Sequence, residues 1–179
     1  YQKAWGEAWG TQAAFVVTNH CEHYAHRIRL IQAISVDSVE IWGNKDGQWG
    51  GWQEIYPQYY KGYLDNEADM ALAYRSIPVN LHSFWSICDQ RTLDCLGTGG
   101  FMIAESTDSN TDVPLDYPGA LNPGMVQVPI QEMPLQIQWY LKHPDERKSI
   151  GLIGSKIVHK HHTYAVRAKE FIDEVKRRF

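Results

Sequence analysis

Short runs of apolar and β-branched residues alternate along this chain with longer segments of helical periodicity. Val39 to Trp42 and Phe101 to Ala104 are typical of the runs, and Glu67 to Ser76 and Pro144 to His161 are typical of the helical segments. This alternation is the pattern of βαβ units, in which a helix carries the chain from one strand to the next parallel strand. The sequence therefore predicts an α/β, Rossmann-like three-layer sandwich with a mostly parallel sheet.

The same pattern gives approximate bounds for each element. We expect strands at 14–18, 39–42, 59–64, 78–83, 101–104 and 125–129, and helices at 22–34, 67–76, 89–97, 135–142, 144–161 and 163–178. The Gly- and Trp-rich segment 45–52 and the polar segment 105–124 are expected to be loops. A loop as long as the second one is more often functional than idle.

Length and composition indicate one soluble domain. The chain has 179 residues, 44% of them hydrophobic and 21% charged, which is enough for one substantial core over residues 1–179. No apolar run reaches the roughly 18 residues of a membrane span, and the first residues do not resemble a signal peptide. The chain has three cysteines, Cys21, Cys88 and Cys95. Their odd number and the absence of CxxC spacing indicate neither a disulfide framework nor a zinc site. We therefore expect a cytoplasmic protein without a transmembrane segment.

Positive charge gathers near the end of the chain, where Lys and Arg outnumber Asp and Glu from Lys142 onward. Amphipathic helices with basic residues on their solvent-exposed faces would explain this. The alternative is a face that meets an anionic acceptor or a membrane surface.

The segment from Arg91 to Gly100, RTLDCLGTGG, carries the most informative chemistry. On a helix Arg91 and Asp94 project from one face, near the carboxyl edge of the sheet, where open α/β sheets bind ligands. A carboxylate there can accept hydrogen bonds from a ribose diol, and glycines let the backbone approach a ligand. The residues alone leave open that the pair is a solvated salt bridge and that GTGG is only a helix stop.

This segment resembles part of the C-terminal, nucleotide-sugar-binding domain of GT-B glycosyltransferases of the CgeB-like, spore-maturation type. In that family a helix reading approximately R-x-F-E-A-L-A-x-G-G precedes a hydrophobic strand. The end of the chain is similar as well, with IQWYLKHPDERKSIGLIGSKIV followed by HTYAVR at 162–167. Upstream, FVVTNHCEHYAHRIRLIQAI, VEIWGN and YKGYLDNEADMALAYRSIPVNLHS resemble the family's first strand, Arg-bearing helix, second strand and base-binding segment.

The resemblance covers nearly the whole chain and implies a function. It implies a half-enzyme that binds a nucleoside diphosphate sugar as donor, needs no metal or other cofactor, and ends in the helices of 134–179. An N-terminal domain absent from this chain would bind the unknown acceptor and carry any catalytic base. Isolated, this half is expected to transfer little or no sugar.

The resemblance also assigns residues to the donor site. Asp94 stands where the family has its ribose-binding Glu, with Arg91 beside it, and Gly99 and Gly100 follow into the diphosphate region. The remaining expected nucleotide-sugar-binding residues are Arg27 and Asn19, Gly62 and Tyr63 near the base, His82 and Ser83 near the pyrophosphate, and Glu105.

Two positions depart from the family pattern. Asp94 is one methylene shorter than Glu, and Ile87 stands where many related enzymes have a second acid. Glu105, directly after an expected strand, is a candidate replacement, although a loop carboxylate is more often solvated. The missing acid keeps open a non-catalytic scaffold domain derived from the same fold. A nucleotide- or phosphosugar-binding enzyme of another α/β class is a further alternative.

Two other groups of residues invite a functional interpretation. His20, His23 and His26, with Cys21, would place three imidazoles along one side of a helix, and imidazole is a common metal ligand, but their spacing matches no recognised zinc pattern. Several tryptophans are candidates for stacking on a sugar or a base, although cores also use Trp for burial alone. The absence of a P-loop, a nucleophile elbow and a complete G-x-G-x-x-G argues against ATPases, esterases and dehydrogenases.

Overall fold

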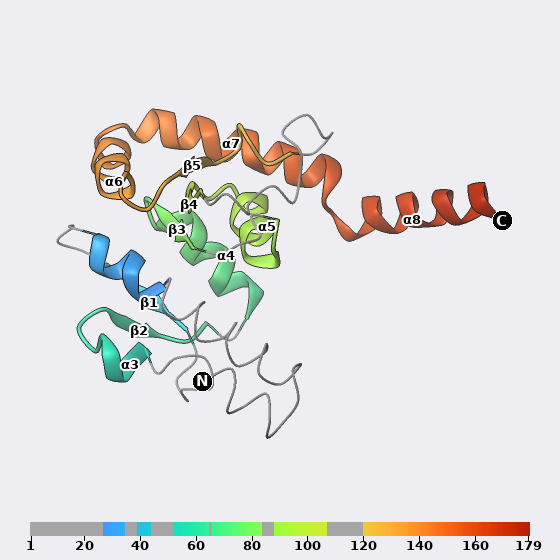
Figure 1. Ribbon diagram of the computed structural model, residues 1–179. Coiled ribbons are helices and arrows are strands. Elements are labelled where there is room, and N and C mark those ends of the chain that lie inside the picture. Colours follow the sequence, from blue (N-terminus) through green and yellow to red (C-terminus); the bar gives the residue numbers. More distant parts are fainter. Residues whose placement is uncertain (1–26, 35–38, 44–51, 65, 84–87, 107–119) are drawn as a thin grey trace, which may run out of the picture. The chain divides into compact units, whose positions relative to one another are not determined.

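The computed structural model describes residues 27–34, 39–43, 52–64, 66–83, 88–106 and 120–179 (Figure 1). The chain divides into two compact units, Tyr1–Tyr63 and Leu64–Phe179, and each is described by itself. The expected strand at 14–18 and the first part of the expected helix at 22–34 lie outside the described residues. The prediction of one domain over residues 1–179 stays a prediction.

The first unit contains a pair of short parallel strands. After a helical stretch at 27–33, the described elements are β1 (Ile41–Trp42), α3 (Trp52–Ile55) and β2 (Tyr60–Gly62). The strands pair in parallel, with Ile41 opposite Tyr60. The strands predicted at 39–42 and 59–64 are therefore confirmed. The short helix α3 was not predicted, because its sequence follows a Gly- and Trp-rich segment without helical periodicity.

The second unit is built on a three-stranded parallel sheet. Its strands are β3 (Asn80–His82), β4 (Met102–Glu105) and β5 (Val126–Val128), in the order β3-β4-β5. Leu81 lies opposite Ile103, which in turn lies opposite Val126. Because β4 is paired on both edges and packs against α5 and α6, all its residues are buried and its sequence does not alternate.

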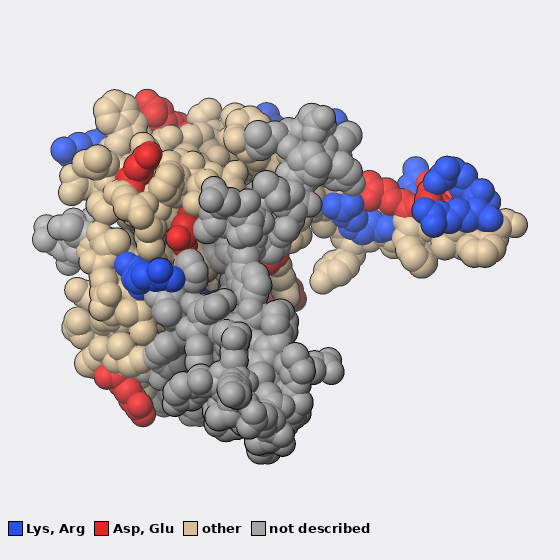
Figure 2. Space-filling model, in the orientation of Figure 1, with Lys and Arg blue, Asp and Glu red and all other residues tan. Residues whose placement is uncertain are grey.

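Five helices accompany this sheet in the described part of the unit. They are α4 (Glu67–Ser76), α5 (Gln90–Gly97), α6 (Met133–Lys142), α7 (Pro144–His161) and α8 (Tyr164–Arg178). Side chains cap three of them: Asn66 accepts from the N–H of Asp69, Asp89 from Thr92, and Thr163 from Val166. The bounds predicted for α4 and α7 are confirmed. Figure 2 shows Lys and Arg side chains gathered on α8.

The HTYAVR motif forms the junction between α7 and α8. His162 follows the last residue of α7, and Thr163 caps α8. A side-chain nitrogen of Arg167 lies 3.0 Å from Nδ1 of His162. These residues close one helix and open the next, which gives the motif a structural role.

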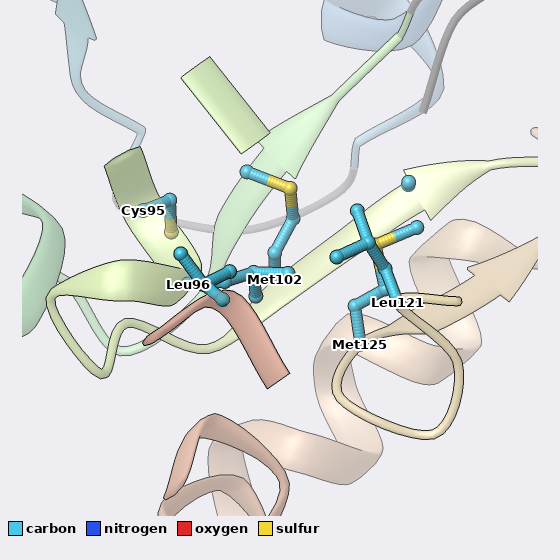
Figure 3. Packing of buried hydrophobic residues seen from close by; sticks show 7 residues of the cluster. Cys95, Leu96, Met102, Leu121 and Met125 are labelled. Atoms are coloured by element: carbon cyan, nitrogen blue, oxygen red, sulfur yellow. The ribbon is translucent and has the colours of Figure 1, made fainter. Parts of the chain in front are cut away.

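The core of the second unit lies between α5, β4 and α7. Its buried members are Cys95 and Leu96 of α5, Met102 and Ala104 of β4, Val158 of α7, and Leu121 and Met125 of the segment before β5. Figure 3 shows Cys95, Leu96 and Met102 grouped on one side of this cluster and Leu121 and Met125 on the other. Since α5 contributes two side chains with no exposed surface, its position is fixed by this core.

Glycines let α7 pack closely against its neighbours. A Cβ atom on Gly154 would lie 2.6 Å from the carbonyl oxygen of Gly124, and one on Gly151 would lie 2.7 Å from that of Gly99. Both distances are shorter than a van der Waals contact, so only glycine fits without a shift of the backbone. The packing holds α7 against the end of α5 and against the turn before β5.

The strand–helix–strand unit β3–α5–β4, with parallel pairing of all described strands, confirms the predicted α/β, Rossmann-like architecture. In the described parts of the chain, none of the helices is both long and apolar enough to cross a bilayer.

Candidate functional site

Two predicted site residues meet where β3 and β4 end side by side. The hydroxyl of Ser83 donates a hydrogen bond of 2.6 Å to Oε2 of Glu105, and both residues are buried. The predicted start of the loop at Glu105 is wrong, because Glu105 is the last residue of β4 and only 7% exposed. Carboxyl ends of parallel strands are where open α/β sheets bind ligands, so this is the edge at which a site is expected.

His82 connects this edge to the first turn of α5. Its Nε2 lies 3.5 Å from Oδ2 of Asp89, the residue that caps α5 by accepting the N–H of Thr92. Sequence reasoning missed Asp89 as a site residue. The only signal was its place as the first residue of the helix predicted at 89–97, three residues ahead of Thr92. The helix dipole favours an anion at this terminus, and the carboxylate of Asp89 already supplies one.

Asp94 lies on α5, partly exposed. Burial raises the pKa of its carboxyl group, and the charges of Glu67 and Asp89 raise that pKa further. Within the described residues, no hydrogen bond or ion pair engages the Asp94 side chain, and Arg91 is exposed without an ion pair to it. The alternative of a salt bridge between Arg91 and Asp94 is therefore not seen. An uncompensated carboxylate of this kind is able to accept hydrogen bonds from a ligand.

Tyr74 of α4 is a second residue that sequence reasoning missed. The pKa of its hydroxyl is raised to about 12, mainly by burial and in addition by the charges of Cys95 and Asp94, while the charge of Arg91 acts in the opposite direction. The hydroxyl is therefore protonated at neutral pH and able to donate a hydrogen bond near Asp94. No motif in the sequence marks this tyrosine, because only the packing of α4 against α5 brings it close.

Gly99 and Gly100 lie at the other end of α5. The N–H of Gly99 donates to the carbonyl of Leu96 and the N–H of Gly100 to that of Cys95, both at 2.9 Å, and Gly99 has a φ of 85°. This pair of hydrogen bonds is a Schellman motif, so the helix stop that the sequence left open is present. The two glycines precede β4 and are not brought together with Ser83 and Glu105. Their part in diphosphate binding stays a prediction.

The remaining predicted residues belong to the first unit or lie outside the described residues. Gly62 ends β2 with a φ of 124°, a conformation that favours glycine, and Tyr63 after it is 60% exposed. Arg27 lies in the helical stretch 27–33. Asn19, the histidines of the metal hypothesis and Ile87 are not among the described residues.

The comparison with known families assigns the chain as a whole. A family model described as "Glycosyl transferase-like" matches residues 25–173, a range that includes every described strand. No curated protein and no solved structure matches the chain significantly. Because the matched range covers most of the sequence, the resemblance to a glycosyltransferase is confirmed at the level of the family. The chain belongs to the glycosyl transferase-like family.

Proposed function

We propose that this chain is the donor-binding half of a GT-B glycosyltransferase of the CgeB-like type, which transfers a sugar from a nucleoside diphosphate to an acceptor. The observation that carries the proposal is the state of Asp94. Its carboxylate is partly exposed, has a raised pKa, and makes no side-chain hydrogen bond within the described part of the chain. A carboxylate left in this state costs stability, which is typical of a functional group.

The partner that suits Asp94 is a ribose with vicinal hydroxyl groups. Two hydroxyl groups can donate to the two oxygens of one carboxylate, and hydrogen bonds to a charged group contribute about 1.5–3 kcal/mol each. Phosphate is a poor partner for this position, since Glu67 and Asp89 surround Asp94 with negative charge. The ribose-binding role assigned by the family resemblance and the local electrostatics therefore agree.

The diphosphate is proposed to lie at the carboxyl edge of the sheet, near the end of β3. His82 and Ser83 lie there, and His82 is 3.5 Å from Asp89 at the N-terminus of α5. Because the carboxylate of Asp89 already occupies the N-terminus of α5, guanidinium groups of the same unit, such as that of Arg91, are the proposed partners for the diphosphate charge. The same charges would stabilise the diphosphate as the bond from its oxygen to the anomeric carbon breaks.

Nucleotide titration tests this proposal. The chain is titrated with UDP, GDP, ADP, CDP and dTDP by isothermal calorimetry, and the titration is repeated with Asp94→Ala. We expect one diphosphate to bind and Asp94→Ala to weaken its binding at least about tenfold, which corresponds to the loss of one hydrogen bond to a charged group. Asp173→Ala, which removes an exposed carboxylate of α8, is the matched control and should bind like the unmodified chain.

Two outcomes would refute the proposal. Failure of every nucleotide to bind would leave the scaffold-domain alternative in its place. Binding that is unchanged in Asp94→Ala would show that the nucleotide occupies another part of the chain. A melting curve of each variant without ligand separates loss of binding from loss of folding.

A further inference from the structure

Helix α8 presents a continuous apolar face that no other described element covers. Its large apolar side chains are Tyr164, Phe171, Ile172 and Val175, with Phe179 directly after the helix, and all five are exposed, Tyr164 to 92% and Phe171 to 70%. Their spacing places them on one face of a helix with 3.6 residues per turn. No residue of α8 is buried. A row of exposed aromatic and branched side chains is the mark of an interaction surface.

Charged residues are sorted around this apolar face. At 3.6 residues per turn, Arg167 and Arg178 border it on one side and Lys169 and Lys176 on the other. Of the acidic residues of the helix, Glu170 and Asp173 project from the opposite face, and Glu174 lies beside Arg167. The exposed ion pairs from Arg167 to Glu170 and from Arg178 to Glu174 stabilise little, so both arginines can exchange them for another anion.

We propose that α8 lies in the interface of an anionic lipid bilayer. Its apolar face would enter the boundary between headgroups and acyl chains, and the flanking basic side chains would extend to lipid phosphates on both sides. The 15 residues of α8 give a length of about 22 Å, which is too short to span a hydrocarbon core of about 30 Å. The helix therefore lies along the surface.

The charge pattern favours a bilayer over a second copy of this chain. Two α8 helices packed face to face would bring their cationic borders together, and like charges at such borders oppose pairing. A planar anionic surface, in contrast, contacts both borders at once. Since this surface involves none of the residues assigned to the donor, the inference does not depend on the proposed function.

Vesicle flotation of the full chain tests the inference. Phosphatidylcholine vesicles with and without phosphatidylglycerol serve as the probe. We expect binding to the anionic vesicles that weakens with salt, and little binding to the neutral ones. Phe171→Glu should abolish binding. Lys169→Gln/Lys176→Gln should weaken it about 25-fold, because each Lys near an anionic surface contributes a factor of roughly five.

A matched variant controls for net charge. Lys148→Gln/Lys156→Gln removes the same charge from exposed positions of α7 and should bind nearly as well as the unmodified chain. Because α8 has no buried residue, Phe171→Glu should also keep the melting temperature. The inference is overturned if anionic vesicles do not bind, or if Phe171→Glu binds them normally. It is likewise overturned if Phe171→Glu only converts a dimer to a monomer in light scattering.

Discussion

Replacing Gly154 with alanine is expected to destabilise the protein, although alanine is the better helix former. In an exposed helix the change would add up to about 1 kcal/mol of stability. Here the new Cβ would lie 2.6 Å from the carbonyl oxygen of Gly124 and 3.1 Å from Cδ2 of Leu96. Overpacking of this kind costs about 1–3 kcal/mol, and the cost lies at the upper end where the obstacle is backbone. We therefore expect a net loss of about 1–2 kcal/mol.

The same substitution in α5 provides the control. A Cβ on Gly97 would lie 3.3 Å from Cγ1 of Val158, a side chain that can yield by a small rotation, so Gly97→Ala should change stability by less than about 1 kcal/mol. Thermal and urea unfolding measure both variants. For a chain of this size, the expected loss in Gly154→Ala lowers the melting temperature by roughly 2–8 °C. A Gly154→Ala variant as stable as Gly97→Ala would refute the close backbone approach of α7 to Gly124.

Three further predictions concern single side chains. Ser83→Ala should lower the free energy of unfolding by about 1–3 kcal/mol, because the buried Glu105 loses a hydrogen bond; unchanged urea unfolding would contradict this. The raised pKa of Asp94 means that its ionisation opposes folding, so stability falls as pH rises from the unfolded value of 3.8 through the higher folded value. At neutral pH, the Asp94→Asn variant should therefore be at least as stable as the unmodified chain, and below pH 3.8 the two should be equally stable. A variant that is less stable at pH 7 would show that other groups compensate the carboxylate after all. Burial raises the pKa of the Cys95 thiol to about 12, so a thiol reagent should modify Cys88 but not Cys95 in the folded chain, as peptide mapping would reveal. Equal labelling of the two would count against the packing of α5.

Most of the fold follows from local signals in the sequence. The bounds of α4 and α7 could be predicted because Asn66 caps the first and Pro144 opens the second. The C-terminal end of α5 could also be predicted, since a Schellman motif depends only on the residues that form it. In contrast, α3 has a single turn and no periodicity, so the sequence carried no signal for it.

The geometry of the candidate site depends on contacts that local patterns do not encode. The hydrogen bond from Ser83 to Glu105 requires β3 and β4 to pair in one register, with His82 opposite Ala104. A list of strands does not fix that register. Tyr74 reaches the surroundings of Asp94 only because α4 packs against α5. The family resemblance directed attention to Asp94, and the structure added the neighbouring carboxylates that raise its pKa.

The central claim is that Asp94 accepts hydrogen bonds from the ribose hydroxyl groups of a nucleotide. Comparing the preferred nucleoside diphosphate with its 2′,3′-dideoxy analogue, in the unmodified chain and in Asp94→Ala, tests it most directly. We expect the unmodified chain to bind the ribonucleotide at least about tenfold more tightly and Asp94→Ala to bind the two equally, because a double-mutant cycle isolates this one contact. An unchanged preference for the ribonucleotide in Asp94→Ala would contradict the claim.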